Sequence, residues 1–213
     1  RIIALDLNEE FTANFSEEQH LNDTVWTNYI RGVVNQMRVN GFEFGGMNCV
    51  FSSNIPSGSG LSSSAALECG FIKGITALFE LDVKPVHIAL MGQKAEHWVG
   101  INCGVMDQFA SVLGLENKVI KIDCKTLEYE YHHADFGNYS LVLLDSNVKH
   151  SLVSSAYNKR REDCELGIAT VKKNFPEVQS FRECTAEHLL AIKDQIDDEV
   201  FVRCHYVIKE ISR

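Results

Sequence analysis

Residues 56–66 read Pro-Ser-Gly-Ser-Gly-Leu-Ser-Ser-Ser-Ala-Ala, and this stretch decides how the fold is interpreted. Its closely spaced glycines allow backbone N–H groups to approach an anion. Apolar residues spaced three and four apart follow at once, from Leu61 to Phe79, so the loop leads into a helix whose first turn carries unpaired N–H groups. Three serines there supply hydroxyls for phosphate oxygens or a magnesium ion. The stretch predicts a phosphate-binding helix start; the alternative is a flexible loop before a serine-capped helix.

The order of the other elements indicates the fold class. The loop fits neither G-x-x-x-x-G-K-S/T nor G-x-G-x-x-G, so the sequence supports neither a Walker P-loop nor a dinucleotide fold. Strands are predicted twice within residues 1–15, joined near Asn8-Glu9, and then at 44–51, 119–123, 127–131 and 140–145. Helices are predicted at 26–37, 61–79, 85–98, 106–113 and 157–175, and two more after Ala186 and Asp198. This irregular mixture favours an α+β fold.

Composition excludes several classes of protein. The chain has 213 residues, of which 45% are apolar and 23% charged, as in ordinary globular proteins. Its net charge of −9 gives no basic footprint for nucleic acid or an anionic membrane. No apolar run is long enough for a transmembrane helix or a signal peptide. Seven cysteines without a C-x-x-C pair predict reduced thiols in the cytoplasm and argue against zinc.

Two further motifs carry chemically useful side chains. Residues 102–109 place Asp107 among small and apolar residues at a predicted helix start. Such an aspartate either caps the helix or accepts a proton from a substrate hydroxyl, and the sequence leaves both open. The third motif runs from Asp145 to Ser151 and is followed by Tyr157 and the basic residues 159–161. Alone, it is typical of a strand–loop–helix junction with a solvated basic turn.

Taken in order, these motifs resemble the galactokinases, a group within the GHMP family of small-molecule kinases. The resemblance rests on Pro-x-Gly-x-Gly-Leu-Ser-Ser-Ser-Ala-Ala, Cys-Gly-Val-Met-Asp-Gln, and Ser-Asn-Val-Lys-His-Ser followed by Tyr and Arg-Arg. Residues 26–33 are also similar to the family's Trp-x-Asn-Tyr-x-x-Gly-Val segment. The resemblance spans essentially the whole chain. It implies an N-terminal, ATP-binding domain like ribosomal protein S5 at residues 1–138 and the start of a ferredoxin-like C-terminal domain at 139–213, with the break in the polar stretch 132–138.

The resemblance also implies ATP and Mg²⁺ as cofactors and assigns residues to them. The loop residues would cradle the ATP phosphates: Gly58, Ser59, Gly60, Leu61, Ser62, Ser63 and Ser64. Ser63 would bind magnesium. Glu96 resembles the family's second magnesium-side carboxylate, although the spacing from Glu96 to Asp107 is one residue shorter than in the family. Trp26 would lie beside adenine; its place on an apolar helix face fits core packing equally well.

On the sugar side, Asp107 would be the catalytic carboxylate that faces the C1 hydroxyl, and Gly104 and Tyr157 would line the galactose pocket with it. The implied reaction is ATP-dependent phosphorylation of galactose to galactose 1-phosphate in the cytoplasm. A kinase for N-acetylgalactosamine or arabinose is an alternative, and so is a non-catalytic sensor that binds ATP and sugar. Such sensors lack part of the Ser-Ala stretch, so the complete sequence at 63–66 favours the enzyme.

Two family motifs fall outside the printed sequence. The first, which supplies a catalytic arginine and most sugar ligands, would precede Arg1, and the Gly-rich third would follow Arg213. We therefore expect a central fragment of a longer enzyme, inactive as a kinase by itself. We also expect apolar faces around Leu5 and Ile208 to be exposed or paired with a second copy.

Overall fold

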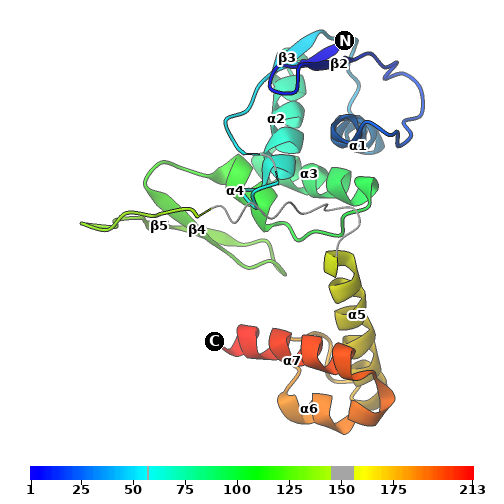
Figure 1. Ribbon diagram of the computed structural model, residues 1–213, viewed down its shortest axis with the longest axis vertical. Helices are drawn as coiled ribbons and strands as arrows, with labels where there is room; N and C mark the ends of the chain where they lie inside the picture. The colour runs from blue at the N-terminus through cyan, green and yellow to red at the C-terminus, as the bar shows by residue number, and fades with distance from the viewer. Residues whose placement is uncertain (57, 145–155) are drawn as a thin grey trace. The chain divides into compact units, whose positions relative to one another are not determined.

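The computed structural model describes residues 1–56, 58–144 and 156–213 and divides the chain into two compact units, Arg1–Val153 and Ser154–Arg213. Figure 1 labels the elements of both units. The described elements of the first unit are β1 (Ile2–Ala4), β2 (Glu9–Phe11), α1 (Val25–Val39), β3 (Cys49–Phe51), α2 (Ser63–Leu78), α3 (Pro85–Val99), α4 (Met106–Leu113), β4 (Lys118–Ile122) and β5 (Tyr129–His133). Those of the second are α5 (Ala156–Asn174), α6 (Ala186–Ala191), a 3-10 turn (Lys193–Gln195) and α7 (Asp198–Ser212). This mixture confirms the α+β prediction.

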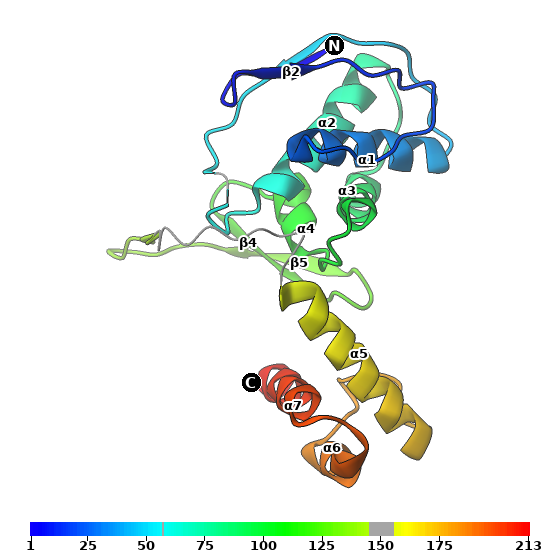
Figure 2. The same cartoon turned by 45° about the vertical axis from the view of Figure 1, so that its right-hand side comes forward.

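The first unit is built on a small sheet and a group of helices. Strand β1 pairs antiparallel with β2 and parallel with β3, so that Ile2 lies opposite both Phe11 and Cys49. Strands β4 and β5 form a separate antiparallel pair. Helix α3 contacts α1, α2 and α4, and Figure 2 shows α1 crossing close to α2 and α3. The arrangement brings the starts of α2 and α4 to the same central helix.

The core of the first unit lies where α1, α2 and α3 meet. Its fully buried side chains come from one face of each helix: Ile30, Val33 and Met37 of α1, Ile72 and Ile75 of α2, and Ala95 of α3. Helices α1 and α3 approach closely at Gly32, where an added Cβ would lie 2.8 Å from the Ala95 carbonyl oxygen. Burial of these apolar side chains supplies the main driving force for folding.

The second unit has its own helical core, with Val171, Leu189, Ile192 and Cys204 completely buried. Ile208 itself is half-buried against this core, whereas Leu5 is 58% exposed as expected; pairing of either face with a second copy stays a prediction. The buried carboxylate of Asp163 bonds to Lys159 at 2.8 Å and also pairs with Arg203. These cations hold the pKa of Asp163 below its usual value, the hydrogen bond from Lys159 contributing most.

The helix predictions are confirmed, whereas several strand predictions need correction. Residues 44–48 are not strand, because the adjacent Gly45 and Gly46 weaken the extended run before β3 begins at Cys49. Residues 140–144 form no strand within the described residues, and residue 145 lies outside them. Strand β5 extends to His133, so the predicted polar hinge at 132–138 begins inside a strand. The division at 153/154 falls later than the predicted domain boundary at 138/139, which stays a prediction.

Within the described residues, no helix combines the length and the apolar character that crossing a membrane requires.

Candidate functional site

The serine-rich loop adopts the backbone conformation typical of an anion site. Gly58, Gly60 and Ser62 all have positive φ, at 72°, 78° and 60°, whereas Ser59 and Leu61 between them do not. Alternating left-handed residues direct successive N–H groups toward one side, where they can meet an anion. Only glycine takes this conformation without strain, which explains two of the three positions.

Among the described residues, the backbone N–H groups in the first turn of α2 receive no capping side chain. Ser62 is the N-cap residue, but within the described chain its side chain makes no capping hydrogen bond. The alternative of a serine-capped helix is therefore not what the structure has. First-turn N–H groups of this kind, together with the helix dipole, favour a bound anion. No acidic residue occupies the first turn of α2 to compete with one.

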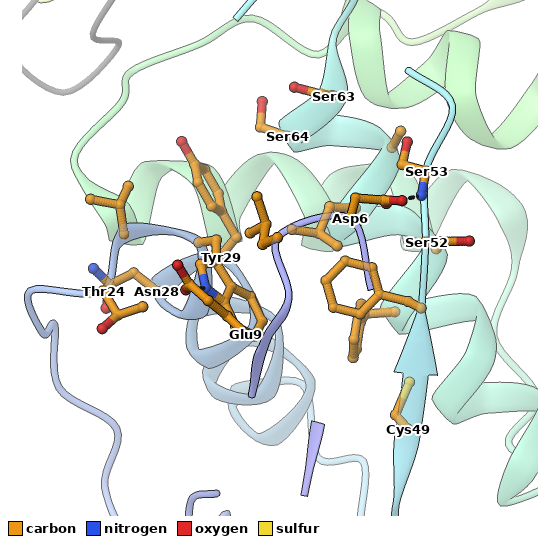
Figure 3. A pocket seen from close by; sticks show the side chains of 18 of the residues that line it. Asp6, Glu9, Thr24, Asn28, Tyr29, Cys49, Ser52, Ser53, Ser63 and Ser64 are labelled. Carbon is orange, nitrogen blue, oxygen red and sulfur yellow. Dashed lines mark hydrogen bonds between the residues drawn. The ribbon is translucent and has the colours of Figure 1, made fainter. Parts of the chain in front are cut away.

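The loop and the helix start open onto a broad pocket of about 1750 Å³. Figure 3 shows Ser63 and Ser64 at the start of α2, with Asp6, Ser52 and Ser53 on neighbouring segments. The Asp6 carboxylate accepts a hydrogen bond from the Ser53 backbone N–H and ties the β1–β2 turn to the segment after β3. Other parts of the lining come from α1 and the segment before it: Leu21, Thr24, Trp26, Asn28 and Tyr29. Hydroxyl groups and aromatic side chains in one pocket are what a nucleotide requires.

Trp26 lies both in the core and at the pocket. Its ring packs in a cluster with Phe11 and Phe51, at centroid distances of 5.3 and 5.8 Å, so it contributes to the core. The same side chain is half-buried and lines the pocket. Its indole Nε1 donates to Glu9 Oε2 at 2.6 Å, which fixes the orientation of the ring. Contact with adenine stays a prediction.

Beneath the serines, Glu96 is the acceptor for a buried hydrogen-bond network. Only 5% of Glu96 is exposed. Ser64 Oγ donates to Oε1 at 2.7 Å, while Gln108 Nε2 at 2.8 Å and Cys103 Sγ at 3.3 Å donate to Oε2. The structure thus places Ser64, rather than Ser63, directly against Glu96. Helices α2, α3 and α4 each contribute one side chain to this junction.

A second carboxyl group, Glu68 of α2, is buried in the same region. It is completely inaccessible, and neither of its oxygens has a hydrogen-bond partner among the described residues. Burial and the negative charge of Glu96 raise the pKa of Glu68 well above its usual value. Burial, with help from both glutamates, also raises the pKa of Tyr29 to about 12, so its phenol stays protonated at neutral pH.

Asp107 lies in the first turn of α4 and is half-buried. The N-cap of this helix is Val105, so Asp107 is not the capping residue that one of the two hypotheses required. The preceding Gly104 is exposed, and an added Cβ there would meet nothing within 4 Å. Both residues lie outside the lining of the large pocket, on the side where α4 follows the Cys103 loop. Their roles toward a sugar stay predictions.

The remaining predicted site residues belong elsewhere. Tyr157 is an exposed residue at the start of α5 in the second unit, and its place beside a sugar stays a prediction. The third motif, residues 145–151, lies outside the described residues, as does Ser57 of the loop.

The donors at this junction fit a magnesium ion. Mg²⁺ prefers oxygen ligands and is commonly held by one or two protein groups together with substrate phosphates. The Ser64 hydroxyl and the Glu96 carboxylate lie side by side, with the Ser63 hydroxyl at the adjacent pocket wall. Among the described residues, Oε1 of Glu96 accepts one hydrogen bond, from Ser64, which leaves it a second lone pair for a cation.

Comparison with known proteins agrees with this site. Residues 28–115 match the family described as GHMP kinases N terminal domain. The matched range includes the serine-rich loop, Glu96 and Asp107, and the α+β fold agrees with it. Over residues 28–115 the chain therefore resembles the GHMP kinases.

Within that family, the chain is similar to galactokinases. It is 37% identical over 191 residues to the galactokinases of Clostridium perfringens strains SM101, ATCC 13124 and 13, covering 88% of this chain and 49% of each relative. It also matches the crystal structure of Lactococcus lactis galactokinase complexed with galactose, with a TM-score of 0.87 and 28% identity, over 99% of this chain and 55% of that one. The chain thus spans about half the length of the relatives it matches.

Sequence reasoning missed three members of the buried junction: Glu68, Cys103 and Gln108. Cys103 and Gln108 lie inside the second motif and Glu68 lies two residues after the first, but no role was assigned to any of them. A detectable signal was the phase of α2, since Glu68 lies on the same face as the apolar Cys69, Ile72 and Ile75. A charged residue in such a face is unusual and indicates a functional or structural role.

Proposed function

We propose that this chain forms the nucleotide-binding part of an ATP-dependent kinase that phosphorylates galactose at the C1 hydroxyl. The observation that carries the proposal is the left-handed loop at residues 58–62, which opens an uncapped helix onto the pocket inside a GHMP kinase domain. The N–H groups of the loop and of α2 bind the ATP phosphates, and the aromatic part of the pocket takes the base beside Trp26.

Magnesium belongs to this proposal. Ser63, as the resemblance implies, and Ser64 with Glu96, as their contact suggests, would hold the ion. When bound, it neutralises charge on the phosphates. Ser64 donates a hydrogen bond to Glu96 Oε1 and keeps the two oxygens together.

Asp107 is proposed as the group that orients the sugar hydroxyl and accepts its proton. Asp107 lies in the first turn of α4, and a carboxylate within reach of a substrate hydroxyl can accept its proton. Gly104 leaves room for a sugar ring beside it, since no atom lies within 4 Å of its would-be Cβ. The galactokinase similarity is the reason to name galactose.

The free state of all seven cysteines supports a cytoplasmic location, which we include in the proposal. The exposed side chain of Leu5 supports self-association of the isolated chain as a further part of it.

The experiment has two arms. In the first, titration calorimetry of the 213-residue chain with ATP and Mg²⁺ measures nucleotide binding. In the second, the aligned 191 residues replace their counterparts in the C. perfringens galactokinase, and ADP formation is followed with galactose, N-acetylgalactosamine or arabinose. We expect ATP binding and ADP formation with galactose. Binding without turnover in a folded chimera would point to a sensor, and preference for another sugar would correct the substrate.

A further inference from the structure

Gln108 carries a buried amide whose nitrogen is hydrogen-bonded and whose oxygen, among the described residues, is not. It is completely inaccessible, and its Nε2 donates to Glu96 Oε2 at 2.8 Å. Its Oε1 has no partner among the described residues. A buried polar group without a full set of partners carries a free-energy penalty, so its presence calls for a reason beyond packing.

The surroundings leave this amide little freedom to move. It follows Asp107 in α4 and lies against α3 at Gly92, where an added Cβ would be 3.3 Å from Gln108 Cγ and 2.9 Å from Cys69 Sγ. The close approach of α3 to both side chains fixes the amide in front of Glu96. The contact therefore links Glu96 rigidly to the first turn of α4.

Glu68 is a second buried carboxyl group in this region, and neither of its oxygens has a hydrogen-bond partner among the described residues. The Gln108 amide is the donor that Glu96 receives from α4. Without it, the two acids would be left in a buried space with one donor fewer, and Glu96 would be free to turn.

We propose that Gln108 is a positioning residue, whose amide holds the Glu96 carboxylate in the orientation that binds the magnesium ion of Mg–ATP. The inference rests on the proposed function and adds to it a residue that does not itself touch the nucleotide. It acts through Glu96, in the way that outer partners of metal-ligating carboxylates commonly do.

The test measures how strongly magnesium and ATP support each other's binding. The coupling ratio is the Kd of ATP in EDTA divided by its Kd in excess Mg²⁺, both from titration calorimetry of the 213-residue chain. Gln108→Met keeps the length and removes the amide. We expect it to lower the coupling ratio about tenfold or more, with a smaller effect on ATP binding in EDTA. Gln93→Met is the matched control, because the Gln93 amide bonds to the Cys103 carbonyl at 3.2 Å instead of to Glu96.

A purely structural role would weaken ATP binding equally in both conditions and leave the coupling ratio unchanged. That result, in a variant whose circular dichroism is native, overturns the inference. If Gln108→Met does not fold, Gln108→Asn keeps an amide that is one methylene too short, and the same ratio decides. A wild-type ratio near one would instead contradict the magnesium part of the proposed function, and the inference would fall with it.

Discussion

The starts of helices α2 and α6 differ in how the unpaired N–H groups of the first turn are satisfied. At α6, Thr185 and His188 form a capping box: the Thr185 hydroxyl accepts from the His188 N–H at 3.3 Å, and His188 Nδ1 accepts from the Thr185 N–H at 3.2 Å. At α2, Ser62 is left-handed and, within the described residues, provides no such bond.

The difference shows where stability has been given up for a ligand. A capping side chain typically contributes about 1 kcal/mol, and a left-handed non-glycine residue costs roughly 1–3 kcal/mol. The start of α2 lacks the stabilising cap and bears the cost of a left-handed residue, although Ser62 is a residue type that can cap a helix. Donors left open in this way are useful only if something else accepts from them. Helices α1, α3, α4 and α7 also lack a capping side chain among the described residues, but their N-cap residues are not left-handed, so the combination distinguishes α2 from them.

The largest expected effect lies at the start of α4. Asp107→Asn in the galactokinase chimera should lower kcat by about 10²–10⁴, because an amide cannot accept the hydroxyl proton. Galactose binding should persist, since the amide still forms hydrogen bonds. Steady-state ADP release measures the first and calorimetry the second. Asp82→Asn, at an exposed acid, is the control. A kcat within about threefold of wild type would remove Asp107 from the mechanism.

At the start of α2, Ser63→Ala should raise the Kd of Mg–ATP by about tenfold to a hundredfold, because a hydrogen bond to a charged group contributes roughly 1.5–3 kcal/mol. Calorimetry of the 213-residue chain measures this directly. Thr76→Val removes a hydroxyl from the same helix, one that bonds to the Lys73 carbonyl, and should leave the Kd unchanged. Loss of stability with an unaltered Kd would show that Ser63 serves the helix alone.

A smaller effect is expected from Gly60→Ala. Its φ of 78° is unfavourable for an L-residue, and among the described residues beyond its chain neighbours none lies within 4 Å of the new Cβ, so backbone strain is the main change. A penalty of about 1–2 kcal/mol should weaken ATP binding roughly fivefold to thirtyfold, since the loop relaxes away from its anion-binding shape. Gly46→Ala, at a position without positive φ, is the matched control. An unchanged ATP affinity would mean that the loop shape is not required.

The smallest functional effect belongs to α6. Thr185→Ala should lower the free energy of unfolding by about 1 kcal/mol, because the cap is lost. It should leave the Kd of Mg–ATP unchanged. Urea unfolding followed at α6 by hydrogen exchange reports the first quantity. If the variant altered nucleotide binding, the two helix starts would not be divided between stability and ligand binding as we infer.

The sequence predicted the features that depend on local pattern. The loop at 58–62, the helix from Ser63 and the first turn that holds Asp107 follow from glycine spacing and 3.6-residue periodicity, which neighbouring residues determine. The junction around Glu96 does not, because Ser64, Glu96 and Gln108 lie 32 and 12 residues apart and meet only through packing of three helices. Which of Ser63 and Ser64 contacts Glu96 also depends on how α2 is rotated about its axis, because successive helical residues point in directions about 100° apart.

The close approach at Gly32 has a consequence for how this sequence can vary. A Cβ atom at position 32 would lie 2.8 Å from the Ala95 carbonyl oxygen, and Ala95 immediately precedes Glu96. Even a single methyl group would have to push α3, and with it the Glu96 carboxylate, away from the helix that carries Trp26. The absence of a side chain at position 32 therefore sets the distance between α1, which carries Trp26, and α3, which carries Glu96. A lineage that keeps the pocket is expected to inherit this glycine unchanged, although it touches no ligand.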